Sequence, residues 1–161
     1  FIDTTNVPKV DKWLRISIDP TFAVPICLVL ESENGRSKLT SKMTDGYGGY
    51  YSGVLKTSST VYLSENFANN IFDKIDSLNI ETLPFRSEAY GSDGSGWFIE
   101  YISNGKYYYL DRWTPTHHGT KSDKELGRIG KQLIDTYKIL EHYVSVQDSS
   151  VRYLEWLKQC N

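Results

Sequence analysis

Two Asn-Gly pairs, at 34–35 and 104–105, constrain the fold of this chain more than any other feature of its sequence. Each pair suits a type I′ turn, because both central positions of that turn need positive φ. Pairing outward from the first turn aligns two pairs of opposite charge and two apolar pairs: Glu33 with Arg36, Glu31 with Lys38, Leu30 with Leu39, and Ile26 with Met43. A slip of one residue would lose all four pairs. The sequence therefore predicts a β-hairpin with this register.

The second Asn-Gly pair predicts another hairpin, from Trp97 to Trp113. Because side chains alternate between the two faces of a strand, the residues of this hairpin divide into two sets. One face holds Trp97, Ile99, Tyr101, Tyr108, Leu110 and Arg112, and the other holds Phe98, Glu100, Ile102, Tyr107, Tyr109, Asp111 and Trp113. The second set carries two carboxylates, which are costly to bury unpaired. We therefore expect it to form the more hydrated face.

Helical and extended patterns fill most of the remaining chain. Strands are predicted at 13–18 and near 60–63, and helices from Ser64 to about residue 78, from a capping box of Ser122 and Glu125 onward, and at about 150–159. Hairpins with segregated helices predict an α+β fold, an antiparallel sheet packed by two or three helices. The length fits a single domain of residues 1–161, in which residues 1–11 are expected to be a loosely held arm.

The composition is that of a compact, soluble domain. Hydrophobic residues make up 39% and charged residues 24% of the chain, which excludes intrinsic disorder. The formal net charge is −2, so the broad basic field that nucleic-acid binding needs is absent. No apolar run approaches the ~20 residues of a membrane-spanning helix.

The second hairpin carries a resemblance to known sequences. From Trp97 to Pro115 it reads Trp-x-x-Glu-x-x-x-x-Gly-x-Tyr-x-x-x-x-Arg-Trp-Thr-Pro. This pattern resembles one in small uncharacterised bacterial proteins, where a strand with Trp and Glu precedes a Gly-x-Tyr hairpin and an Arg-Trp-Ser-Pro ending. Thr114 stands where serine is usual. The resemblance is firm over this segment and loose around it. It implies a bacterial source and a shared fold, and it assigns no activity and no functional residue.

Neither the cysteines nor the start of the sequence assigns a compartment. Cys27 lies in an apolar run and is expected to be a small buried residue, whereas Cys160 is next to last. A disulfide between them stays open. The sequence begins at Phe1, which is compatible with an export signal upstream. Bacterial cytoplasm and periplasm are both consistent with these features.

Motifs for cofactors and metals are incomplete in this sequence. Gly46-x-Gly48 lacks the third glycine of a dinucleotide-binding loop, since position 51 is tyrosine. The stretch from Gly127 to Lys131 lacks the Ser or Thr of a phosphate-binding loop, and its glycines are expected to permit close packing of a helix. The histidines and nearby acids lack the spacing of paired metal ligands: His117, His118, His142 and Asp111. We therefore expect neither a cofactor nor a metal.

The strongest functional candidate is a cluster on the second face of the Trp97–Trp113 hairpin, formed by Glu100, Tyr107, Tyr109, Asp111 and Trp113. Aromatic rings around two acids could bind a sugar, a peptide or a cationic partner. The sequence therefore favours a non-catalytic interaction module that uses this face and the glycine-rich loop at 45–53. Small acidic bacterial domains of this size include toxin-neutralising proteins and exported binding proteins, and either fits by analogy alone.

Three alternatives stay open for this cluster. The tyrosines could pack under the 45–53 loop or a helix, with their hydroxyls bonded to Glu100 and Asp111. The same two acids, as diagonal neighbours on one sheet face, could be the acid and base of a small glycosidase-like hydrolase, with the tyrosines and Trp113 as sugar platforms. A structural subunit would have this face covered by a second copy. Arg112 is expected to stack on Trp97, or alternatively to recognise an anion.

Overall fold

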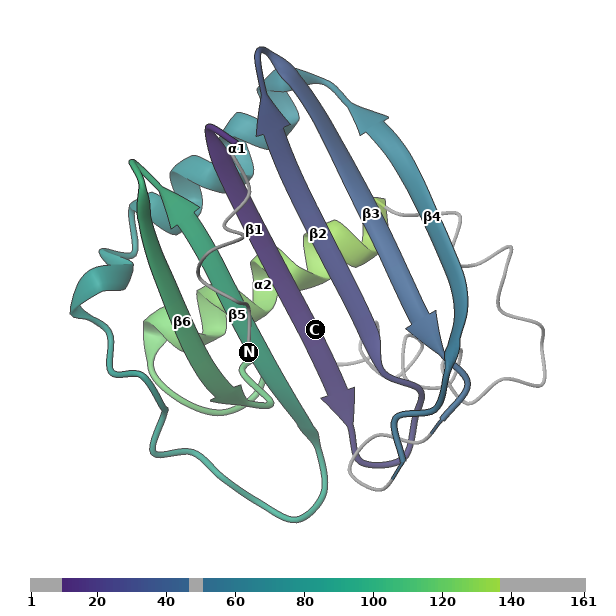
Figure 1. Ribbon diagram of the computed structural model, residues 1–161. Coiled ribbons are helices and arrows are strands. Elements are labelled where there is room, and N and C mark those ends of the chain that lie inside the picture. The colour runs from purple at the N-terminus through teal and green to yellow at the C-terminus, as the bar shows by residue number, and fades with distance from the viewer. Residues whose placement is uncertain (1–9, 47–50, 137–161) are drawn as a thin grey trace.

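Residues 10–46 and 51–136, the part of the chain that this computed structural model describes, form one six-stranded antiparallel sheet and two α-helices (Figure 1). The strands are β1 (Lys12–Pro20), β2 (Ile26–Glu33), β3 (Arg36–Thr44), β4 (Leu55–Leu63), β5 (Ser95–Ser103) and β6 (Lys106–Trp113). The helices are α1 (Glu65–Asp76) and α2 (Lys121–Thr136), with a 3-10 turn, η2, at Ile80–Thr82. The α+β class that the sequence predicts is confirmed.

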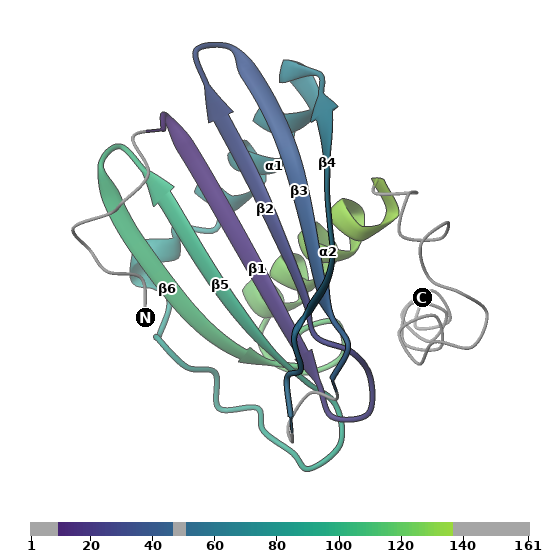
Figure 2. The same ribbon diagram turned by 45° about the vertical axis from the view of Figure 1, so that its right-hand side comes forward.

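The sheet and the helices form two layers. The strands run in the order β4-β3-β2-β1-β5-β6, and each neighbouring pair is antiparallel. Both helices lie behind the sheet in Figures 1 and 2. No described helix covers the opposite face, which we call the helix-free face. Neither α1 nor α2 is long and apolar enough to cross a membrane.

The hairpin strands pair in the register expected from the sequence. The cross-strand partners include Glu33 with Arg36, Glu31 with Lys38, Leu30 with Leu39, Ile26 with Met43, Glu100 with Tyr109, and Phe98 with Asp111. The connecting residues have positive φ: 50° at Asn34, 72° at Gly35, 52° at Asn104 and 70° at Gly105. Positive φ at both connecting residues matches the twist of the flanking strands. Local turn chemistry and cross-strand pairing therefore agree in both hairpins.

The core lies between the sheet and the two helices. Its strand residues alternate with those of the helix-free face and include Leu14, Ile16, Ile18, Leu28, Leu30, Leu39, Trp97, Ile99 and Leu110. Trp97 is completely buried and lies against α2 at Gly130, where an added Cβ would come within 3.0 Å of Trp97 Cη2. At Gly127 an added Cβ would be 2.7 Å from Thr116 N. The expectation that these glycines permit close helix packing is confirmed.

The N-terminus of α2 differs from the expectation. Thr120, not Ser122, forms the capping box: Thr120 N donates to Asp123 Oδ2 over 2.8 Å, and Asp123 N donates to Thr120 Oγ1 over 3.2 Å. Glu125 instead pairs with Arg128 on the helix surface. Both candidate pairs have the same spacing of hydroxyl and carboxylate, so the pattern alone could not choose between them. The end of the predicted helix and the helix at 150–159 lie outside the described residues.

Three other expectations are adjusted by the structure. The strand expected near 60–63 is longer, because β4 begins at Leu55. Cys27 is half-buried on the helix-free face rather than in the core, since β2 directs Ile26 and Leu28 inward, and Ser17 Oγ lies 3.6 Å from its Sγ. Its pairing with Cys160 lies outside the described residues. Most of the expected arm does too, but Asp11 N donates to Ser32 O, which ties this residue to the sheet.

Candidate functional site

The helix-free face divides into two halves of different chemistry. Strands β1, β5 and β6 contribute an aromatic half, formed by Trp13, Arg15, Phe98, Glu100, Ile102, Tyr107, Tyr109, Asp111 and Trp113. Strands β2, β3 and β4 contribute a polar half that includes Glu31, Lys38, Thr40, Lys42, Thr60 and Tyr62. The five residues of the sequence-predicted cluster all belong to the aromatic half. The structure therefore brings the predicted cluster together on one surface.

Glu100 lies at the centre of the aromatic half and is fully engaged. Its side chain is only 4% exposed, and its Oε2 accepts from Arg15 on the neighbouring strand β1. Its Oε1 accepts from the Tyr107 hydroxyl over 2.7 Å. The Arg15 guanidinium lies 5.5 Å from the centre of the Trp13 ring, a distance typical of a cation–π contact. A buried carboxylate is tolerated here because both of its oxygens have partners.

Asp111 is also held by an arginine, but from a different segment. Arg86 Nε donates to Asp111 Oδ2 over 2.7 Å. The backbones of the two segments are hydrogen-bonded as well. Asp111 N donates to Phe85 O over 2.8 Å, and Ser87 N donates to Asp111 O over 3.2 Å. The loop segment at 85–87 therefore lies along the outer edge of β6. Neither acid of the predicted pair stands free on the surface.

A row of aromatic rings crosses this half of the face. The Phe85 and Tyr109 ring centres are 5.3 Å apart, and those of Tyr109 and Phe98 are 6.4 Å apart. Phe85 is 59% exposed and Tyr107 39% exposed, while Tyr109 is half-buried. Trp113 is also half-buried, and the loop before β5 packs on it so closely that a Cβ at Gly91 would be 3.0 Å from the indole nitrogen. The row presents apolar area at its outer end and well-packed rings behind it.

No protein-family model matches this chain, and no curated protein is significantly similar to it. The geometry of the site and elementary chemistry are therefore the basis for the functional proposal.

Residues that complete the site were missed by reasoning from sequence. Arg15, Phe85 and Arg86 contact the predicted cluster, yet none lies in the hairpin that contains it. Alternation along β1 places Arg15 on the face opposite Leu14 and Ile16, so its face could have been predicted. Its partner could not, because that depends on β1 lying next to β5.

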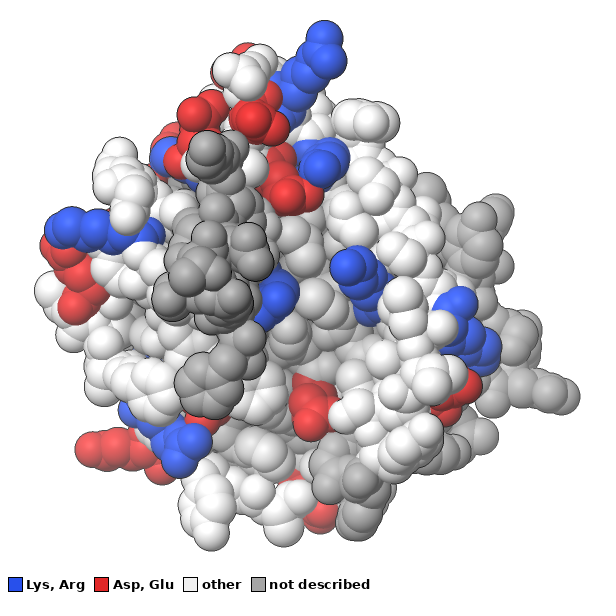
Figure 3. Space-filling view, viewed as in Figure 1, with Lys and Arg blue, Asp and Glu red and all other residues white. Residues whose placement is uncertain are grey.

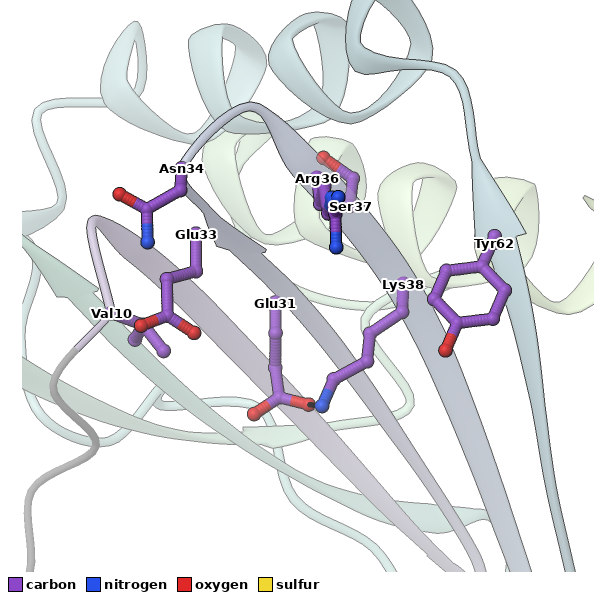
Figure 4. A pocket seen from close by; sticks show the side chains of 8 residues that line it. All are labelled: Val10, Glu31, Glu33, Asn34, Arg36, Ser37, Lys38 and Tyr62. Atoms are coloured by element: carbon purple, nitrogen blue, oxygen red, sulfur yellow. Dashed lines mark ion pairs between the residues drawn. The ribbon is translucent and has the colours of Figure 1, made fainter.

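The polar half contains a shallow hollow at the β2–β3 hairpin (Figure 4), with a volume of about 460 Å³. It is lined by Val10, Glu31, Glu33, Asn34, Arg36, Ser37, Lys38 and Tyr62. Figure 4 shows Glu31 and Lys38 directed toward one another, and their charged atoms are 3.1 Å apart. Acids and bases alternate in this hollow. It therefore has no concentration of one charge that would select an ion.

Charges of both signs also share the visible part of the helix-free face. Figure 3 shows acidic and basic side chains interspersed among the described residues there, without a broad patch of one sign. Within the described residues no group of three His, Cys, Asp or Glu side chains could hold a metal ion. His117 and His118 have ring centres 6.4 Å apart on the connection before α2. His142 lies outside the described residues.

Arg112 has a structural role that differs from both sequence-based hypotheses. It is 1% exposed, and its Nε is paired with the buried carboxylate of Asp123 in α2. Its Nη2 donates to Pro84 O and its Nη1 to Phe85 O, over 2.8 and 3.0 Å. The Trp97 indole N–H donates to Ser95 Oγ over 2.8 Å. Arg112 therefore joins β6, α2 and the segment that carries Phe85.

The Tyr107 hydroxyl provides a pH-dependent test of the Glu100 network. Burial, then the hydrogen bond to Glu100 and the charge of Glu100, raise the pKa of Tyr107 above its usual value. The folded protein thus holds this proton more tightly than the unfolded chain. The stabilisation is complete below about pH 10, the usual pKa of tyrosine, and decreases as the pH rises above it.

We expect the free energy of unfolding to decrease more steeply above pH 10 in the wild type than in Tyr107→Phe. Urea unfolding at a series of pH values between neutrality and strong alkali measures both slopes. Equal slopes would show that the hydroxyl does not share a proton with the Glu100 network in solution.

Proposed function

We propose that this protein is a non-catalytic interaction module that binds a protein partner through the aromatic half of its helix-free face. The observation that carries the proposal is the ring row from Phe98 through Tyr109 to the exposed Phe85, with Tyr107 beside it. Tyrosine and tryptophan are frequent at the energetic centres of interfaces, because they offer large apolar area with few rotatable bonds and a polar tip. The ion pairs of Arg15 with Glu100 and of Arg86 with Asp111 lie on the same half and hold this surface in place before a partner binds.

The same proposal extends to the kind of partner that the protein binds. A bacterial toxin that this protein neutralises, or a ligand of an exported binding protein, would both suit a small domain with a net charge of −2. A balanced charge distribution over the face favours recognition by shape and apolar contact over long-range attraction.

The proposal is tested by removing rings at the exposed end of the row. Proteins that bind the immobilised full chain would first be identified, and one would then be purified for calorimetric titration. We expect Phe85→Ala and Tyr109→Ala each to weaken its Kd by about 30-fold, which corresponds to about 2 kcal/mol at an interface centre. Tyr62→Ala removes an exposed ring on the polar half and serves as the control.

Thermal unfolding would establish that each variant is folded. Unchanged binding by both folded ring variants would contradict the proposal, and so would an equal loss in Tyr62→Ala, because the binding surface would then lie elsewhere.

The alternative is a small hydrolase that uses Glu100 and Asp111. It needs two carboxyls open to a cleft, one to donate a proton and one to assist a nucleophile or water. Both carboxyls are instead engaged by arginines, Glu100 by Arg15 and Asp111 by Arg86. This arrangement supports the binding proposal better. Hydrolysis of a panel of chromogenic glycosides that is lost in both Glu100→Gln and Asp111→Asn would favour the alternative.

A further inference from the structure

Strand β4 forms one outer edge of the sheet. Within the described residues, no segment pairs with the side of β4 that faces away from β3. Alternate residues of an edge strand direct their backbone N–H and C=O groups outward, where they can pair with another strand. Apolar side chains near both ends of β4 are exposed as well: Val54 is 62%, Leu55 58% and Tyr62 82% exposed. The edge is nine residues long, and its part from Thr57 to Leu63, which pairs regularly with β3, carries groups able to accept a partner strand.

The opposite edge of the sheet is protected. The backbone of Phe85 and Ser87 bonds to Asp111 of β6, and Arg112 fixes the adjoining carbonyls of Pro84 and Phe85. Natural sheets commonly cover their edges in this way or place charges on them to prevent strand pairing. In contrast, Lys56 is the only charged residue among the nine of β4. Among the described residues, the β6 edge of the sheet is therefore covered by another segment, whereas the β4 edge is not.

We propose that β4 pairs antiparallel with β4 of a second copy of this chain, across a two-fold axis at Ser59. The pairing of β4 with β3 is regular from Thr57 to Leu63 and shifts register beyond Thr57. In the proposed pairing Thr57 of one copy faces Val61 of the other, and Ser58 faces Thr60. The strand is thus complementary to itself, which is what a two-fold interface requires.

The side chains also suit this register. The regular part of the strand, from Thr57 to Leu63, contains no charged residue. Thr57 and Val61 are β-branched residues, which pack well as cross-strand neighbours. No pair in this register places like charges opposite each other.

The dimer would arrange the aromatic halves in a defined way. Because β4 and β6 are opposite edges of the sheet, pairing through β4 does not involve either aromatic half, and the two halves lie at the two ends of one continuous sheet. A two-fold axis perpendicular to the sheet keeps both helix-free faces on the same side. The self-association and the partner binding proposed above therefore use separate surfaces, and each can fail without the other.

Sedimentation equilibrium of the full chain, from low to high micromolar concentration, tests the pairing. We expect a monomer–dimer equilibrium in the wild type. Ser59→Lys and Ser59→Glu each place two like charges at the axis and are expected to weaken self-association at least about tenfold. An equimolar mixture of these two variants is expected to recover association, because opposite charges then meet across the axis. Ser59→Thr is the matched control and should associate like the wild type.

Three results would overturn the proposal. The first is a wild type that stays monomeric throughout the concentration range. The second is a dimer that both charged variants leave unchanged, since it would use another surface. The third is a mixture of the two folded charged variants that fails to associate, which would contradict an axis at Ser59. Far-ultraviolet circular dichroism and thermal unfolding of each variant separate these results from loss of folding.

Discussion

Replacing Arg112 with methionine is expected to lower the free energy of unfolding by about 3–5 kcal/mol. Methionine keeps much of the apolar volume but leaves the Asp123 carboxylate, which is 5% exposed, without its ion-pair partner. Removing one member of a buried ion pair costs this much because the remaining charge stays desolvated. The carbonyls of Pro84 and Phe85 lose donors as well, which loosens the segment that protects the edge of β6.

Urea unfolding of three variants would separate the charge effect from loss of packing. Asp123→Asn keeps an acceptor for the Thr120 amide and removes the charge, so the double variant Arg112→Met with Asp123→Asn should regain part of the lost stability. Arg128→Met breaks an exposed pair with Glu125 and should change stability by less than about 1 kcal/mol. A loss in Arg112→Met no larger than that control would show that the buried pair is not a stabilising element.

The second large effect is expected at Trp97. Trp97→Ala should lower the free energy of unfolding by about 3–5 kcal/mol, because it leaves a cavity between β5 and α2. The neighbouring residue Phe98 points to the other face and is half-buried, so Phe98→Ala should cost clearly less and serves as the positional control.

The contact of Trp97 with Gly130 allows a second substitution to test the same packing. Alanine normally favours a helix over glycine by about 1 kcal/mol, yet Gly130→Ala should destabilise the protein, because the new methyl group would meet the indole ring. Combined with Trp97→Ala, the same methyl group would occupy part of the cavity. The double variant should therefore lose less stability than the sum of the losses in the two single variants. Strict additivity in urea unfolding would show that the ring and the helix are not in contact.

The sequence by itself determined what local chemistry controls. The cross-strand partners of both hairpins follow from adjacent turn residues and from pairs only a few positions apart, so few alternative registers compete. Alternation separated the Trp97 face, which is core, from the Tyr107 face, which is helix-free. The helix that became α1 was predicted to start at Ser64, which is its N-cap and whose side chain accepts from Phe67 N. In each case the interacting groups lie close together in the chain.

The tertiary structure decided which distant groups meet. Insertion of β1 between β2 and β5 brings Arg15 to Glu100, although 85 positions separate them. The path of the loop before β5 brings Arg86 to Asp111, and the approach of α2 brings Asp123 to Arg112. A charged residue in an alternating strand reveals its face but not its partner, because strand order depends on the packing of the whole sheet against its helices. The acids of the candidate site were therefore predictable as a cluster, whereas their engagement by arginine was not.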